Sequence, residues 1–265
     1  MLKSTTSALK STLLVINSKD RTPDSVSASN FSYSIGQSLD VQSVTIKSIS
    51  IPVTQYNIQP DSTKLNIVIN SVFYQFVIPV GQYSVTEVIV KLQTYINSLG
   101  VVTCTISQNP NTFKIEIVSN VSINFVLPFY TTNPTPLGPM LGLPKNKTIS
   151  GYTLFPNSSS LSYSLPNIPA FQGLMNYYIL TRILSEGSNG IFANGLLDAL
   201  QTNVPIDVSF GKVQNYRPYL LENNTITFIR PINIQYIDIR IVDKDLKVVD
   251  LNGQNVELVY KLVLN

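Results

Sequence analysis

The chain has 265 residues, of which 44% are hydrophobic and only 12% are charged, and its formal net charge is +3. Histidine is absent, which excludes Ser-His-Asp and Cys-His catalysis and every usual zinc site. Two carboxylates would suffice for a glycosidase, but no cleft-type pattern supports one, and the chain has no tryptophan for sugar stacking. We therefore expect a protein that is not an enzyme, with no catalytic residues, cofactor, metal or small-molecule substrate.

The low charge also indicates how the surface is used. Ordinary soluble domains carry roughly 25% charged residues, so this surface depends on Ser, Thr, Asn and Gln for its hydration. Such a surface is easier to explain when neighbouring molecules cover much of it, as in an assembly. A mildly polar monomer is the alternative.

The first segments in chain order are an apolar run at residues 12–16, a charged corner at residues 17–23 and an alternating stretch at residues 31–35. Alternation of apolar residues with serines is the period-two pattern of a half-buried antiparallel strand. The corner is rich in turn-forming residues and predicts a tight, solvated turn. We expect residues 1–30 to be an N-terminal arm that leads into the first sheet.

The strand that follows changes phase. Val44 and Ile46 share one face, whereas Ile49 and Ile51 share the other, so we expect a bulge near residues 47–48 that keeps both pairs buried. Pro52 should end the ladder because it has no N–H group to donate.

The next residues predict a hairpin and the one helix of the chain. Residues 65–69 and 72–78 alternate on either side of Asn70-Ser71. Ser84 and Glu87 have the spacing of a capping box, and apolar residues then recur at helical intervals as far as Leu99. This helix interrupts an otherwise all-β pattern, and packing on its own sheet is its simplest role.

Short strands are expected at residues 102–106, 113–117 and 121–125, and Cys104 within them is interpreted as a small buried hydrophobe. Residues 131–169 are rich in Pro, Gly, Ser and Thr and predict long loops. Residues 174–184 predict a further strand. The glycines that follow it lack the Gly-Lys-Ser/Thr of a phosphate loop.

The last third has the clearest strand pattern, at residues 225–229, 234–242 and 256–264, with a turn at residues 250–253. Asp243, Asp245 and Asp250 lack the central Gly and closing Glu of a calcium-binding loop, so we interpret them as solvated turn residues.

The basic residues are scattered, which argues against a nucleic-acid surface. The N-terminal arm, with Lys3, Lys10, Lys19 and Arg21, is the one segment with enough charge to touch phosphate, and a solvated tail is its simpler interpretation. No apolar run reaches the roughly 18 residues of a membrane span, and we expect a chain without a secretory signal.

The order of these elements resembles penton-type minor capsid proteins of virophages and polinton-like viruses, which have relatives among large eukaryotic DNA viruses. The matching features, in order, are Asn17-Ser18-Lys19-Asp20-Arg21, the strand ending in Ile51-Pro52, Tyr56-Asn57-Ile58, Gly81-Gln82-Tyr83, the LGPMLGL element at 137–143 and the closing residues 243–265. Together they touch about two thirds of the chain. The LGPMLGL element departs from the leucine-glycine-phenylalanine form of the family.

Many short alternating strands with long loops predict an all-β antiparallel sandwich of two sheets with one short helix. The pattern leaves a jelly roll and an immunoglobulin-like sandwich both open, and the resemblance selects the jelly roll. We expect a single jelly-roll domain over residues 31–265, with the loop-rich stretch at 131–169.

The resemblance further implies a homopentamer at the five-fold vertices of an icosahedral capsid, in contact with the major capsid protein. It places the protein in the virion, after assembly in the host cytoplasm. The alternatives are a receptor- or carbohydrate-binding sandwich, such as a fibre head or lectin-like domain, and another minor capsid or cement protein.

Overall fold

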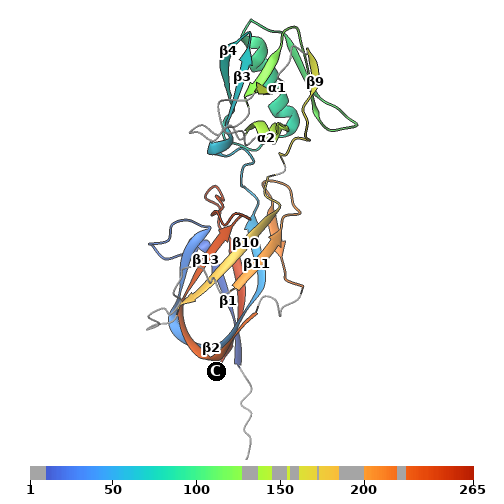
Figure 1. Cartoon of the computed structure of the whole chain (residues 1–265). Helices are drawn as coiled ribbons and strands as arrows, with labels where there is room; N and C mark the ends of the chain where they lie inside the picture. The colour runs from blue at the N-terminus through green and yellow to red at the C-terminus, as the bar shows by residue number, and fades with distance from the viewer. Residues whose placement is uncertain are drawn as a thin grey trace, which may run out of the picture. The chain divides into compact units, whose positions relative to one another are not determined.

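The computed structural model describes residues 10–126, 137–144, 154–155, 161–171, 173–184, 200–219 and 225–265. The chain divides into two compact units (Figure 1). The first contains residues 1–55 and 174–265, and the second contains residues 56–173. This division differs from the expected single domain over 31–265, because a separate unit is inserted between two strands of the first.

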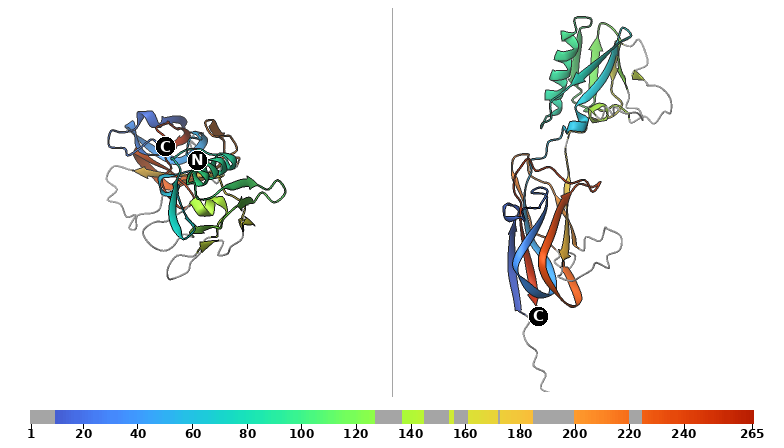
Figure 2. Two further views of the ribbon diagram at one scale, coloured as in Figure 1. Left: turned by 90° about the horizontal axis from the view of Figure 1, so that it is seen from above. Right: turned by 90° about the vertical axis from the view of Figure 1, so that its left-hand side faces the viewer.

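The first unit is built from seven antiparallel strands: β1 (Lys10–Asn17), β2 (Asn30–Pro52), β10 (Asn176–Leu184), β11 (Leu200–Pro205), β12 (Val213–Tyr216), β13 (Thr225–Val242) and β14 (Glu257–Leu264). Their order is β1-β14-β2-β13-β10-β11, and β12 pairs with β2 as well. Figures 1 and 2 show that β2 and β13 are long and strongly bent.

The bend of β2 places its two halves in different sheets. On one side, residues 41–50 of β2 pair with β14; on the other side, residues 49–52 pair with β12 and residues 43–45 with the start of β13. The first sheet therefore runs β1-β14-β2, followed by β12 and the start of β13. Residues 30–34 and 39–41 pair with the rest of β13, which pairs with β10, so the second sheet runs β2-β13-β10-β11. Both long strands thus take part in both sheets. This strand order is that of a jelly roll, and it confirms the predicted sandwich.

Each long strand changes sheet at an irregularity in its register. In the pairing of β13 with β2, Thr227 lies opposite Ser43 but Ile232 lies opposite Val41. The extra residues on β13 include Pro231, which has no N–H group and is tolerated in a strand mainly at such bulges.

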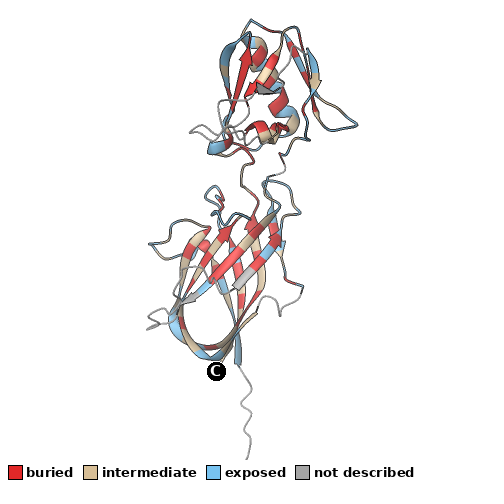
Figure 3. Cartoon of the chain, in the orientation of Figure 1, coloured by how far each residue is buried: buried red, intermediate tan, exposed pale blue. Residues whose placement is uncertain are grey.

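The two sheets enclose one hydrophobic core, which draws buried side chains from all the strands except β12, whose partly buried Tyr216 packs against it. Figure 3 shows buried residues alternating with paler ones along these strands. On β14, for example, Leu258, Tyr260 and Leu262 are buried, whereas Val259 and Lys261 are not. The core-facing residues of β10 are Tyr177, Ile179 and Thr181.

The first described part of the expected arm belongs to the jelly-roll sheet. All eight residues of β1 pair with β14, and Ile16 is fully buried. The corner after β1 is a short 3-10 helix, η1 (Ser18–Asp20), where Asn17 accepts a hydrogen bond from the Lys19 N–H. Residues 1–9 lie outside the described part of the chain, so the role of an arm there stays a prediction.

The second unit has its own core and two small sheets. The first sheet has the order β4-β3-β7-β8, and the second has the order β5-β6-β9. The strands are β3 (Lys64–Ile69), β4 (Val72–Val77), β5 (Cys104–Gln108), β6 (Ile115–Ser119), β7 (Ile123–Val126), β8 (Leu154–Phe155) and β9 (Ser162–Ser164), and the helices are η2 (Pro60–Ser62), α1 (Val85–Ser98) and α2 (Leu137–Leu141).

Helix α1 begins as predicted. The Ser84 Oγ accepts a hydrogen bond from the Glu87 N–H, and the Glu87 carboxylate accepts one from the Ser84 N–H, which together form the capping box. Its buried face packs into the core of this unit with Cys104. The LGPMLGL segment forms α2 and contributes three buried leucines to the same core.

Asn57 joins the two ends of the inserted unit. Its Nδ2 donates to the carbonyl oxygens of Tyr83 (2.7 Å) and Phe171 (2.8 Å), and its Oδ1 accepts from the Tyr83 N–H (3.0 Å). The Asn57 N–H also donates to the Gln82 side chain at 3.1 Å. The chain therefore enters and leaves this unit at one point.

Candidate functional site

The candidate calcium ligands near the C-terminus are turn residues in the structure. The Asp243 Oδ1 accepts hydrogen bonds from the Asp245 N–H (2.8 Å) and the Lys247 N–H (3.0 Å). Asp250 accepts one from the Asn252 N–H at 2.8 Å. Across the described residues, no group of three or more Cys, Asp or Glu side chains is placed to hold a metal ion.

Cys104 has the character of a buried structural thiol. Its side chain is 3% exposed in the core of the second unit, and burial raises its pKa to about 11. A protonated thiol is a poor nucleophile, so the residue is suited to packing rather than to chemistry. None of the described helices is long and apolar enough to cross a membrane.

The outer face of the first jelly-roll sheet carries an unusual aliphatic patch. On the edge strand β1, Leu13 and Val15 are 63% and 53% exposed. Val15 lies opposite Val259 of β14, and Val263 stands on the same face, four residues along β14. We call Leu13, Val15, Val259 and Val263 the β1–β14 patch. On the same face, Lys261 lies opposite Leu13, between the two valines of β14. Outward positions of an antiparallel sheet are ordinarily polar, so four aliphatic side chains on this face indicate an interface.

Hydroxyl side chains continue this face across β2. Ser43 lies opposite Val263, Thr45 opposite Lys261 and Ser48 opposite Val259. The Oγ1 atoms of Thr45 and Thr225 lie 2.8 Å apart and share a hydrogen bond. Neutral hydroxyl groups lose less on desolvation than charged groups do, so the face suits contact with another protein surface.

The outer face of the second sheet has a different character. It presents Tyr178 and Arg182 from β10 and Tyr236, Asp238 and Arg240 from β13, in neighbouring register. Asp238 accepts a hydrogen bond from the Ser32 hydroxyl at 2.5 Å. Aromatic residues and arginine are enriched at protein interfaces. The sandwich thus has an aliphatic outer face and an aromatic, charged one.

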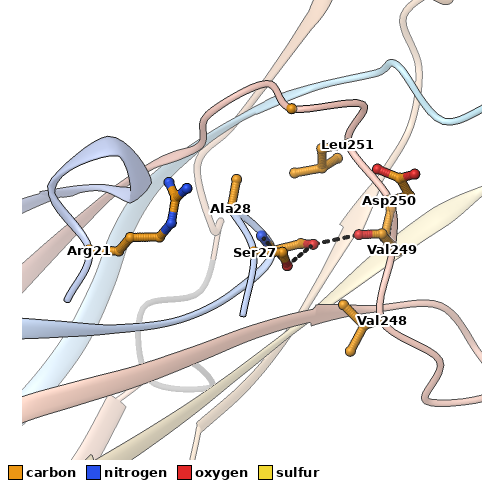
Figure 4. Close-up of a pocket in the computed structure, with 9 residues that line it drawn as sticks. Arg21, Ser27, Ala28, Val248, Val249, Asp250 and Leu251 are labelled. Atoms are coloured by element: carbon orange, nitrogen blue, oxygen red, sulfur yellow. Dashed lines mark hydrogen bonds between the residues drawn. The ribbon is translucent and has the colours of Figure 1, made fainter. Parts of the chain in front are cut away.

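A pocket of about 310 Å³ lies between the turn after β1 and the loop after β13 (Figure 4). Arg21 and Asp250 line it, and Ala28, Val248 and Leu251 supply apolar wall. Ser27 also lines it, in a hydrogen-bonded series with Ser29 and the Val249 carbonyl oxygen. We call it the Arg21 pocket.

The second unit exposes an apolar strand edge. Val72, Phe73 and Val77 of the edge strand β4 are each more than half exposed. Exposed edges of this kind are available for contacts with another chain. Much of the predicted 131–169 loop region lies outside the described residues.

The β1 part of the β1–β14 patch could be predicted from the sequence. Residues 13–16 are Leu-Leu-Val-Ile, with no polar residue in alternation, so both faces of that strand had to be apolar. The Arg21 pocket had no such signal, because it joins residues more than 200 positions apart.

No protein-family model matches the chain, and no curated protein matches it. Among solved structures, the chain is similar to the crystal structure of a selenomethionine-labelled mavirus penton protein, with 10% sequence identity and a TM-score of 0.47. That similarity covers 97% of this chain and 100% of the other. The Sputnik virophage structure, solved by cryo-electron microscopy at 3.5 Å, is similar with 11% identity and a TM-score of 0.34, over 96% of this chain and 98% of that chain.

Proposed function

We propose that this chain is a viral structural protein, a penton that forms a homopentamer at the five-fold vertices of an icosahedral capsid. The observation that carries the proposal is the pair of unlike outer faces on one jelly roll. The β1–β14 patch is aliphatic, and the opposite face presents Tyr178, Arg182 and Tyr236.

A closed ring of identical subunits needs such a pair. Each subunit of a cyclic oligomer larger than a dimer meets its neighbours through two different surfaces in head-to-tail contact. The outer faces of a two-layer sandwich lie on opposite sides, so each can meet the other face of the next copy. Five-fold symmetry comes from the resemblance of the sequence motifs to pentons, as does contact with the major capsid protein.

The role is geometric rather than chemical. The protein works without a cofactor, a metal or a small-molecule substrate, and its place is the virion. Assembly in the host cytoplasm belongs to the same proposal. Nucleic acid is not a partner in this proposal, except for contact by the N-terminal arm at residues 1–30.

Native mass spectrometry of the purified full chain tests the oligomer. A pentamer is the expected result, whereas a stable trimer would favour a fibre or major-capsid role and contradict the proposal. Location in a cryo-electron microscopy map of the virion tests the vertex: density for this chain away from the five-fold axes would also contradict it.

A further inference from the structure

The Arg21 pocket contains an exposed cation that makes no ion pair among the described residues. The Arg21 Nη1 donates to the Ser18 carbonyl oxygen at 2.8 Å, and this is the one contact that the guanidinium makes among the described residues. A guanidinium has five N–H donors in a fixed fork, so Arg21 retains a pair for a planar carboxylate.

The anchor of this arginine is rigid. Ser18 is fully buried, and its hydroxyl donates to the Asn255 side chain (3.1 Å) and accepts from the Val256 N–H (3.0 Å). The Ser18 N–H also donates to the Val256 carbonyl oxygen at 2.9 Å. One hydrogen bond therefore ties the exposed guanidinium to a rigid acceptor beside the pocket, which lowers the entropy cost of binding.

The other polar groups of the pocket are acceptors. The Ser29 hydroxyl gives its single proton to the Val249 carbonyl oxygen, so the Ser27 hydroxyl must donate to Ser29. The Ser27 Oγ accepts the Ser29 N–H and keeps one lone pair. One carboxylate oxygen of Asp250 accepts the Asn252 N–H, and the other has no partner among the described residues.

This arrangement selects the chemistry of the ligand. Arg21 calls for an anion, but Asp250 in the same pocket repels a multiply charged one such as a phosphate chain. The remaining acceptors call for hydroxyl donors, and Ala28 and Val248 offer apolar contact to a C–H face. We propose that the Arg21 pocket binds an acidic monosaccharide, with its carboxylate on Arg21 and its ring hydroxyls on Ser27 and Asp250.

All the lining residues belong to the first unit, so the binding test does not require the pentamer. Its volume of about 310 Å³ lies at the lower end of the range for small-ligand sites, which is roughly 300–1,000 Å³. A single sugar ring bound there would attach weakly. Multiple copies in an assembly would raise the avidity for a glycan-coated surface.

Saturation-transfer NMR on the full chain tests the proposal, with glucuronic acid and N-acetylneuraminic acid as probes. We expect binding of at least one of these acids, and at least about tenfold weaker binding of the acid's methyl ester, because the ester cannot form the charge-assisted pair. The proposal would be overturned if neutral glucose bound as tightly as glucuronic acid. It would also be overturned if glycine bound more tightly than the sugar acids, or if neither acid bound.

Variants locate the site. Arg21→Gln should weaken acid binding at least about tenfold, and Arg21→Lys should weaken it less, because lysine keeps the charge but loses the fork. Arg217→Gln, at an exposed arginine outside the pocket, is the matched control and should bind like the parent chain. An unchanged affinity in a folded Arg21→Gln chain, verified by circular dichroism, would overturn the assignment.

Discussion

Thr181 Oγ1 and Tyr260 Oη lie 2.9 Å apart in the jelly-roll core and form a hydrogen bond between strands of opposite sheets. Both residues are fully buried. Thr181 is on β10 and Tyr260 is on β14, which are not neighbours in the strand order. The pair is a polar link across the jelly-roll core that joins the two layers.

Removing one hydroxyl of this pair should lower the free energy of unfolding more than removing both. We expect Tyr260→Phe to lower the free energy of unfolding by about 1–3 kcal/mol, because the Thr181 hydroxyl is left buried without a partner. The double variant with Thr181→Val should recover about 1 kcal/mol of that loss. Urea unfolding of the parent, the two single variants and the double variant measures the coupling. Strictly additive losses would show that the two hydroxyls do not interact.

Stability should fall at high pH through Tyr177. Its hydroxyl is fully buried with no hydrogen-bond partner among the described residues, and burial raises its pKa from 10.0 to about 12. Between these values the folded chain holds a proton that the unfolded chain has released, so the free energy of unfolding decreases as pH rises. Below pH 10, Tyr177 is protonated in both the folded and the unfolded chain, so it does not make the free energy of unfolding depend on pH.

The comparison that isolates this effect is Tyr177→Phe against the parent chain, followed by urea unfolding at pH 8, 10 and 11. The variant should lose less stability than the parent above pH 10, and at pH 8 it should be as stable or slightly more so. Cys104 shifts in the same direction in both proteins and cancels in the difference. Identical pH profiles would contradict the prediction.

The β1–β14 patch should be required for assembly but not for folding. Val15→Glu places a charge at an exposed position, so the monomer should keep its fold while the ring contact is lost. Native mass spectrometry should show a shift from pentamer to monomer. Val26→Glu is the matched control, because Val26 is 82% exposed and lies outside the patch. Equal pentamer fractions in the two variants would show that the β1–β14 patch is not part of the interface.

Alanine substitutions at two glycines of the second unit distinguish the cost of backbone strain from the cost of a steric clash. Gly142 has a φ of +104°, and a Cβ there would lie 2.2 Å from the Asn167 carbonyl oxygen, whereas Gly100 has a φ of +72° and open space. Gly100→Ala should cost about 1–2 kcal/mol from strain alone. Gly142→Ala should cost about 3 kcal/mol or more, because Asn167 must also move. Thermal unfolding followed by circular dichroism compares them, and equal losses would mean that the clash is relieved without cost.

Local features of the fold could be predicted where one short segment determines them. The register of β14 against β2 skips Lys47, which confirms the expected bulge, and β2 ends at Pro52 as predicted. The hairpin at Asn70-Ser71 also forms, with both residues at positive φ. A proline, a change of strand phase and a tight turn each depend on only a few neighbouring residues, so the local sequence is enough to predict them.

The pairing of strands that lie far apart in the sequence could not be predicted from the alternation of side chains. The link between Ser32 and Asp238 spans 206 residues, and alternation of side chains does not say which distant strand is the partner. The inserted unit was missed for this reason, since its strands have the same pattern as those of the jelly roll. For residues 174–184 the pattern predicted a strand but not its buried face, which carries Tyr177 and Ile179.

Asn57 gives the inserted unit a further use. One side chain holds residues 57, 83 and 171 together, so the polypeptide leaves the jelly roll and returns to it within a short span. A foreign domain with closely spaced ends could therefore be spliced in place of residues 56–173 without stretching the strands on either side. On an assembled particle, that junction would serve as a cassette for displaying antigens or binding modules.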